Sequence, residues 1–209
     1  MFVVAQISDL HFNGTAAHRD RIDAVLNYLN VECDGPKTID ALLVTGDLAD
    51  EGLPAEYREA AETLTSGIPM LTLLGNHDDR AAYTEVTTGT ASTAPVNSAL
   101  RLPGTQAHPG GLLILALDSS IPGRSDGYLS EDTLTWAAEQ IDGAAGADVL
   151  ISFHHPPATI GLPFMDERRL FDTDRLEALI ADHPAVVGVV TGHAHTPAVT
   201  TFADRPLIA

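Results

Sequence analysis

Hydrophobic residues in this chain form short continuous runs that alternate with stretches of helical spacing. Continuous apolar runs of this length are typical of strands that are covered on both faces. They predict strands at Phe2–Ile7, Ala41–Thr45, Met70–Leu74, Leu112–Leu117, Val149–Phe153 and Val186–Thr191. Strands that alternate with helices indicate an α/β fold with a largely parallel sheet.

The stretches between these strands carry helical signals. The first has apolar residues at i, i+3, i+4 and i+7, which form one face of a helix: Ile22, Val25, Leu26 and Leu29. Three further helices are predicted, with Ser130 as N-cap, with Pro54 in the first turn, and with Asp174 as N-cap and Glu177 three residues later. Glu85–Asn97 is rich in Thr, Ser, Gly and Ala, and we expect it to be a loop.

The composition indicates a single globular domain over residues 1–209, since 44% of the residues are hydrophobic and 19% are charged. A net charge of −18 argues against a broad basic surface for long nucleic acids or anionic membranes. The apolar runs fall far short of the ~20 residues that cross a bilayer. With Cys33 as the sole cysteine, no intrachain disulfide can form. We therefore expect a soluble, cytoplasmic protein.

Polar side chains follow five of the predicted strands directly. Because loops at the carboxyl edge of an open α/β sheet converge on one crevice, we expect these residues to be neighbours. The five segments are Asp9-x-His11, Gly46-Asp47, Gly75-Asn76-His77-Asp78, His154-His155-Pro156-Pro157 and Gly192-His193-Ala194-His195.

These side chains offer imidazole, carboxylate and amide donors without a thiolate, which suits Mn, Fe, Zn or Co. Seven candidate ligands are too many for one ion, but they suit two ions that share a carboxylate. Two ions ~3.5–4 Å apart can hold a bridging hydroxide and clamp a phosphoryl group. Their charge also explains how an acidic protein can attract a phosphate.

In this order, the five segments resemble the signatures of the calcineurin-like metallophosphoesterases, and they span residues 9 to 195. The resemblance implies a four-layer αββα sandwich of two mixed β-sheets flanked by helices. It also implies that relatives continue beyond the point where this chain ends, fourteen residues after His195. We therefore expect a shortened second sheet, and a homo-oligomer remains open.

The resemblance further implies a role for each site residue. One metal ion would be held by Asp9, His11, Asp47 and His195, and Asp47 would bridge to a second ion that is also held by Asn76, His154 and His193. His77 would lie over the phosphate and protonate the leaving oxygen. Asp78 would orient His77 or, equally well, cap the helix that follows.

Finer features resemble the bacterial class III cyclic-nucleotide phosphodiesterases and the glycerophosphodiesterases. They are the paired histidines before two prolines, the Leu117-Asp118-Ser119 strand end with Gly127-x-Leu129, and the segment Gly161–Asp166. The implied activity is hydrolysis of a small phosphodiester, such as a 3′,5′-cyclic nucleotide or a glycerophosphodiester, by a metal-bridging hydroxide. A phosphomonoesterase, a nuclease acting on short nucleic acids and an inactive protein-binding scaffold remain as alternatives. The filled ligand positions argue against the scaffold.

Several other residues have readings that the sequence leaves open. His155 is expected in the pocket wall, and Asp118 is expected to have a structural hydrogen-bonding role. A second group of side chains could contact the substrate, but packing in the protein or exposure to solvent accounts for them equally well: Phe164, Met165, Arg168 and Arg169. We expect no site role for a third group, which has no partner motif: His18, His108 and His183.

Overall fold

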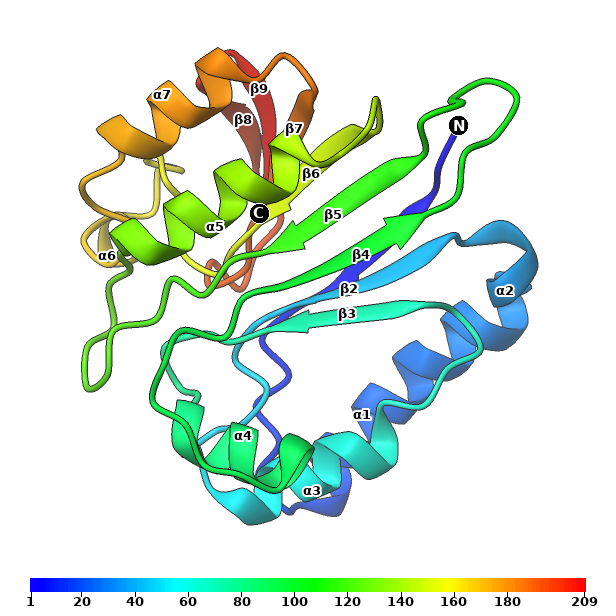
Figure 1. Cartoon of the computed structure of the whole chain (residues 1–209). Helices are drawn as coiled ribbons and strands as arrows, with labels where there is room; N and C mark the ends of the chain where they lie inside the picture. The colour runs from blue at the N-terminus through cyan, green and yellow to red at the C-terminus, as the bar shows by residue number, and fades with distance from the viewer.

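The computed structural model describes all 209 residues and contains two β-sheets (Figure 1). The smaller sheet is entirely parallel and has the order β1-β2-β3, with β1 at Val4–Ile7, β2 at Ala41–Thr45 and β3 at Met70–Leu73. The larger sheet has the order β4-β5-β6-β7-β9-β8, and β4 and β8 run antiparallel to their neighbours. Its strands are β4 Ser98–Leu102, β5 Leu112–Ala116, β6 Asp148–Ser152, β7 Val186–Val190, β8 Val199–Phe202 and β9 Arg205–Ile208.

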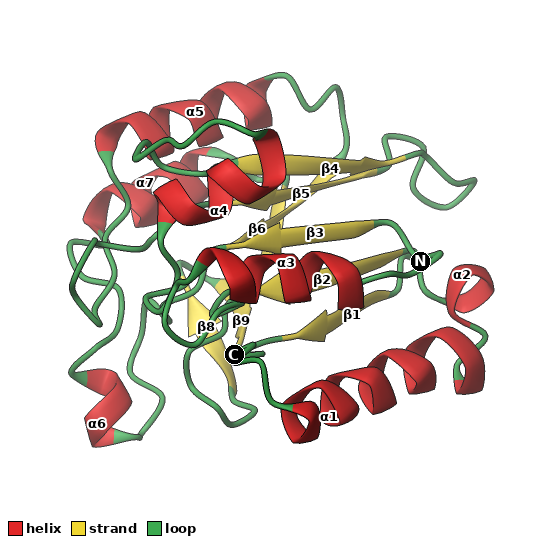
Figure 2. Cartoon of the chain, turned by 90° about the horizontal axis from the view of Figure 1, so that it is seen from below, coloured by secondary structure: helices red, strands yellow, loops and turns green.

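Helices cover the outer faces of both sheets (Figure 2). In the first half of the chain these are α1 Ala16–Asn27, which continues into the π-helical turn Tyr28–Glu32, α2 Gly35–Thr38, α3 Pro54–Thr63 and α4 Arg80–Thr88. The second half contributes α5 Glu131–Asp142, α6 Pro163–Asp166 and α7 Asp174–Asp182.

The hydrophobic core confirms the predicted four-layer sandwich. Leu43 of β2 packs between the sheets in one cluster with Ile114 of β5. Its neighbour Leu42 faces the opposite way and packs against Leu26 of α1. Because both faces of β2 are buried, its sequence is continuously apolar. Only the larger sheet is mixed, so the expectation of two mixed sheets is wrong for the smaller one.

All six predicted strands are present, with ends that differ by at most two residues. The sequence pattern missed β4, β8 and β9. These strands are short and partly exposed, so they lack a continuous apolar run. The second sheet has six strands, and two of them follow His195. Its shortening relative to relatives stays a prediction.

The helix predictions are confirmed with small corrections. Ser130 caps α5 by accepting a hydrogen bond from the backbone N–H of Thr133 at 3.2 Å, and Pro54 is the first residue of α3. The N-cap of α7 is Thr173 and not Asp174. The expected loop at Glu85–Asn97 begins inside α4. None of the helices combines the length and the apolar character that a bilayer crossing requires.

The topology brings the polar strand ends to one edge of the molecule. The loop after β1 runs beside the loop after β2, because the N–H of Asp9 donates to the carbonyl of Gly46 at 3.1 Å and that of His11 to the carbonyl of Asp47 at 3.0 Å. On the larger sheet, the N–H of Gly192 donates to the carbonyl of His154 at 2.9 Å. These bonds continue the strand pairing into the loops and fix the loops against one another.

Candidate metal centre

Four of the predicted ligands form one group at this edge. The ligand atoms of Asp9, His11, Asp47 and His195 all lie within 4.8 Å of one another. Asp9 Oδ1 is 3.4 Å from His195 Nε2, and His11 Nε2 is 3.8 Å from Asp47 Oδ2. These are the residues that the family resemblance implies for the first ion, and they come from the loops after β1, β2 and β7.

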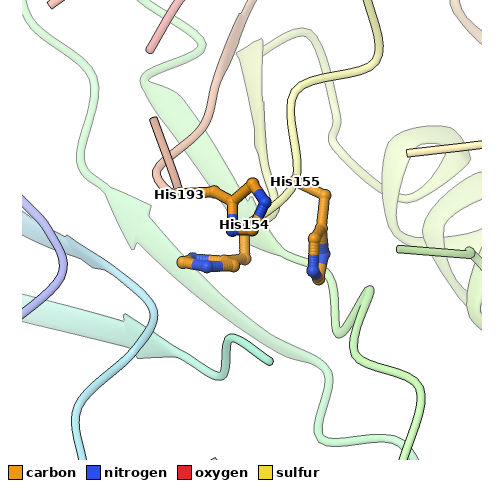
Figure 3. Close-up of side chains that lie close together, drawn as sticks. All are labelled: His154, His155 and His193. Carbon is orange, nitrogen blue, oxygen red and sulfur yellow. The ribbon is translucent and has the colours of Figure 1, made fainter. Parts of the chain in front are cut away.

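A second group lies beside the first and consists of buried histidines from the loops after β6 and β7. Figure 3 shows His154, His155 and His193 side by side, and their ligand atoms lie within 4.8 Å of one another. His154 Nε2 is 3.3 Å from Asp47 Oδ2, the same oxygen that faces His11 in the first group. Asp47 therefore lies between the two groups, where a shared carboxylate is needed.

The unpaired polar atoms of the site provide a test of whether it fits metal ions. Buried polar atoms in proteins nearly always have a hydrogen-bond partner. In this chain the buried side-chain atoms that lack one are Asp9 Oδ1, His11 Nδ1, Asn76 Oδ1, His154 Nε2, His155 Nε2 and His193 Nε2. All six belong to the strand-end segments. Nitrogen and oxygen donors of this kind fit borderline transition-metal ions, so the residues present suit such a centre.

His155 contributes a buried imidazole that sequence reasoning did not count among the ligands. Its Nδ1 lies 2.8 Å from Ser119 Oγ, and its ring centroid is 4.8 Å from that of His193. A side chain at Gly127 would collide with the His155 ring, so the glycine makes room for it. The position agrees with the expected place in the pocket wall. Only the fold shows that the Nε2 atom is buried beside the ligands.

The backbone at the ligands is unusual. Five of the seven predicted ligands have left-handed φ values, a region that non-glycine residues rarely occupy and that costs on the order of 1–3 kcal/mol per residue. They are Asp9 (57°), His11 (46°), Asp47 (49°), His193 (68°) and His195 (50°). A side chain at Gly75 would collide with the Asp47 carboxylate. Tight turns and this glycine thus bring the ligand atoms together.

The negative charge of Asp47 and the positive charge of His154 stabilise each other in the interior of the site. Burial alone raises the pKa of the Asp47 carboxyl, but the nearby His154 imidazole outweighs it and holds that pKa below its ordinary value. Burial alone lowers the pKa of His154, but Asp47 outweighs it and raises the pKa to about 9. Burial, followed by the His154 charge, lowers the pKa of His193 to about 3. His193 is therefore neutral near pH 7, as a metal-binding imidazole must be.

A family model described as calcineurin-like phosphoesterase matches residues 2–197. The chain belongs to this family. It is therefore a metal-dependent phosphoester hydrolase, and the matched range contains all the strand-end segments described above.

Curated relatives of this phosphoesterase cover most of its length. A probable cyclic nucleotide phosphodiesterase of Synechococcus sp. is 34% identical over 99% of this chain and 80% of its own length. A glycerophosphodiester phosphodiesterase of Enterobacter lignolyticus is 27% identical over 96% of this chain and 73% of its own. A cAMP/cGMP dual specificity phosphodiesterase of Mycobacterium tuberculosis is 30% identical over 99% of this chain and 65% of its own length.

Solved structures share the fold of this phosphoesterase. A dimetal phosphatase from Danio rerio superposes with a TM-score of 0.72 at 13% identity, over 99% of this chain and 86% of its own. GAP50, described as the anchor in the inner membrane complex of Plasmodium, superposes with a TM-score of 0.69 at 14% identity. The match covers 99% of this chain and 70% of GAP50. At these identities the likeness concerns the fold alone.

The ring of His77 lies beside the first ligand group and is exposed. Its Nδ1 is 2.7 Å from the carbonyl oxygen of Asp50, and its ring contacts that of His11 edge-on with centroids 4.6 Å apart. Sequence reasoning missed Asp50, whose carboxylate Oδ1 also lies 3.3 Å from His11 Nδ1. The Asp50 carbonyl is thus placed to orient the His77 ring, a backbone contact for which the sequence carries no signal.

Asp78 differs from both expectations. Its carboxylate accepts hydrogen bonds from the backbone N–H groups of Leu48, Ala49 and Gly75 and from the hydroxyl of Tyr57. It therefore joins the loops after β2 and β3 and does not hydrogen-bond the His77 ring. The expected helix cap is wrong as well, because Asp79 caps α4 by accepting from the N–H of Ala82 at 2.8 Å.

The remaining predicted residues lie where a structural role is expected. Asp118 is buried and accepts from Arg80 Nε at 2.7 Å and from the backbone N–H of Ser120 at 2.9 Å, as predicted. His108 pairs with Asp148 at 3.0 Å, and His183 Nδ1 lies 2.6 Å from the carbonyl of Leu179. Neither histidine belongs to a ligand group.

Proposed function

We propose that this phosphoesterase hydrolyses small phosphodiesters, such as 3′,5′-cyclic nucleotides or glycerophosphodiesters, at a dinuclear centre. The observation that carries the proposal is the cluster of buried ligand atoms that lack a hydrogen-bond partner, with His154 Nε2 among them 3.3 Å from the Asp47 carboxylate. Relatives that cover nearly the whole chain are named as phosphodiesterases of these two substrate classes, which supports the same reaction.

Each ion in this proposal has four ligands. Asp9, His11, Asp47 and His195 hold the first, as their mutual distances allow. The second is held by Asp47, Asn76, His154 and His193, of which Asn76, His154 and His193 carry unpaired buried atoms. The donors suit Mn, Fe, Zn or Co. When bound, such ions polarise the phosphoryl oxygens and lower the pKa of the attacking water.

The chain's own residues complete the reaction. His77 donates from Nδ1 to the carbonyl of Asp50, at 2.7 Å, and this bond leaves Nε2 free to face the substrate. A proton on Nε2 passes to the departing alkoxide oxygen, which is otherwise a poor leaving group. The hydrogen bond to Asp50 keeps the ring oriented for this transfer.

Turnover of matched substrates tests the proposal. Protein loaded with Mn²⁺ is assayed on bis(p-nitrophenyl) phosphate, 3′,5′-cyclic AMP, glycerophosphoethanolamine and the monoester p-nitrophenyl phosphate. We expect the diesters to be hydrolysed faster than the monoester, and chelation followed by Mn²⁺ addition to abolish and restore the activity. Faster monoester turnover would contradict the diester assignment. A well-folded protein that binds no metal would support an inactive scaffold.

A further inference from the structure

Phe164, in the single-turn helix α6, is unusually exposed for a large aromatic residue. Its exposed fraction is 65%, although burying such a ring is favourable. The Arg168 guanidinium lies over this ring, 3.7 Å from its centroid, and Arg168 Nη1 donates to the Phe164 carbonyl at 2.8 Å. These two contacts fix the orientation of an aromatic ring that is largely open to solvent. We call this pair the Phe164–Arg168 platform.

The platform is attached to the wall of the metal centre. The N–H of Gly127, which lies against the His155 ring, donates to the carbonyl of Arg169 at 3.2 Å. At the next residue, the N–H of Leu170 donates to the carbonyl of Pro156 at 2.9 Å, directly after His154 and His155. Figure 2 shows α6 on the side of the molecule towards which β1, β2 and β3 run. The segment that carries the platform therefore adjoins the wall of the metal centre through its contacts with Pro156 and Gly127.

A hollow of about 510 Å³ adjoins the platform, a size that suits a small organic ligand. It is lined by Arg124, Ser125, Asp126, Glu167, Arg168 and Phe171. Arg124 is paired with the carboxylate of Asp126. The Arg168 guanidinium is instead held by a carbonyl and a ring and forms no ion pair, in a chain whose net charge is −18. Its remaining N–H groups are free to meet an acceptor.

We propose that the Phe164–Arg168 platform binds the base of a nucleotide diester and makes this enzyme prefer nucleotide diesters to glycerol diesters. A base presents a flat π face that stacks on aromatic rings and guanidinium planes, and its ring nitrogens and carbonyls accept hydrogen bonds. A glycerol group has no such face. The catalytic part of this inference rests on the proposed function, whereas the binding part does not.

Kinetic selectivity tests the catalytic part. The ratio of kcat/KM for 3′,5′-cyclic AMP to that for glycerophosphoethanolamine is measured for the parent, Phe164→Ala, Phe164→Tyr and Tyr28→Ala. We expect Phe164→Ala to lower the ratio about tenfold, mainly through KM for the nucleotide, and Phe164→Tyr to retain it. Tyr28 is also an exposed aromatic residue, 59% exposed, but it lies in the turn after α1 and serves as the matched control. An unchanged ratio in Phe164→Ala overturns the proposal.

Binding separates failure of the platform from failure of the proposed function. Calorimetry with Mn²⁺-loaded protein compares AMP with glycerol 3-phosphate, which share the phosphate but not the base. We expect the parent to bind AMP about tenfold more tightly and Phe164→Ala to lose this preference. If the parent prefers AMP but hydrolyses no diester, the platform proposal is supported and the diesterase proposal is refuted. If the parent hydrolyses diesters but does not prefer AMP, the diesterase proposal is supported and the platform proposal is refuted.

Discussion

Asp47 and His154 are separated by more than a hundred residues, yet Asp47 Oδ2 lies 3.3 Å from His154 Nε2 in the interior of the protein. Both side chains are almost completely buried. The contact joins the loop after β2, in the smaller sheet, to the loop after β6, in the larger one. This carboxylate–imidazole pair is therefore one of the contacts that join the two halves of the sandwich, beside the hydrogen bond from His154 Nδ1 to the carbonyl of Thr45 at 2.7 Å.

Replacement of Asp47 tests the shared carboxylate. Asp47→Asn preserves the shape of the side chain and removes its charge, so we expect metal content to fall from two ions to one or none. Diester turnover should fall at least ~100-fold, since even residues that only support ligands are worth 10–100-fold. Elemental analysis and kinetics measure the two effects. Asp142→Asn is the control, because that carboxylate is 77% exposed and outside the site. Two retained ions in Asp47→Asn would refute the bridging role.

Metal binding should depend steeply on pH. Because Asp47 raises the pKa of His154 to about 9 in the metal-free protein, an ion must displace a proton below that pH. We expect affinity to rise about tenfold per pH unit from about pH 7 and to level off near pH 9. Calorimetry with Zn²⁺ or Co²⁺ in several buffers measures affinity and proton release together. Affinity that does not change over this range would contradict the ion pair.

The Asp47–His154 pair should make the metal-free fold more stable at low pH than at high pH. This pH dependence is opposite to that of metal affinity. A histidine whose folded pKa exceeds its unfolded value of about 6.5 stabilises the fold fully below that value. The contribution, at most about 3 kcal/mol, disappears as the pH rises through about 9. Denaturant unfolding of chelated protein at pH 6 and 9 should therefore show lower stability at pH 9. His154→Gln should lose most of this difference, whereas His108→Gln should keep it.

His77 should affect catalysis without affecting metal binding. We expect His77→Gln to lower kcat by about 10²–10⁴, because the leaving oxygen loses its proton donor. The loss should be smallest for substrates with acidic leaving groups such as p-nitrophenol, which need no proton. Metal content should stay at the parent level. An equal loss for all leaving groups would argue against proton donation by His77.

Asp78 should act mainly on stability. Asp78→Ala leaves the N–H groups of Leu48, Ala49 and Gly75 without their carboxylate acceptor, and each unpaired buried donor costs about 1–3 kcal/mol. We expect the free energy of unfolding to fall by several kcal/mol. Tyr57→Phe removes only the hydroxyl contact and should cost about 1 kcal/mol. Chemical denaturation with and without Mn²⁺ measures both variants. A change in kcat without a change in stability would instead place Asp78 in the chemistry.

Gly75 tests how tightly the site is packed. A methyl group at Gly75 would collide with the carboxylate of Asp47, so Gly75→Ala should displace that carboxylate and weaken metal binding. Gly143→Ala is a matched control, because its methyl group would meet no atom closer than 3.3 Å. The difference between the two variants in Co²⁺ affinity reports the effect. Equal Co²⁺ affinities in the two variants would mean that the loop after β3 shifts to accommodate the methyl group without displacing the Asp47 carboxylate.

Much of the fold could be predicted because buried strands leave a strong mark in the sequence. β2 is apolar at Ala41, Leu42, Leu43 and Val44, since helices cover one face and the second sheet covers the other. β8 has exposed residues at Val199, Thr200 and Thr201, and its pairing with β9 depends on tertiary contacts. No local pattern records such contacts, so these strands were missed.

The sequence likewise identifies some residues of the candidate site but not their contacts. The ligand residues could be named because each follows a strand directly, and the topology then brings them together. The contacts of Asp50 and Asp78 could not be named. Asp78 accepts N–H groups from a loop some thirty residues away, and Asp50 uses its carbonyl as well as its carboxylate. Backbone partners of this kind depend on loop conformation, which residue identity does not specify.

The left-handed backbone at the ligands limits how the centre can be re-engineered. Aspartate, asparagine and histidine tolerate positive φ better than other side chains with a Cβ atom, so the residue types that suit these turns are also those predicted to bind the ions. Exchanging Asp9 or Asp47 for glutamate keeps the charge but adds length and loses that tolerance. Attempts to shift metal preference by introducing longer carboxylates or thiolates at these positions will therefore be opposed by the turns themselves.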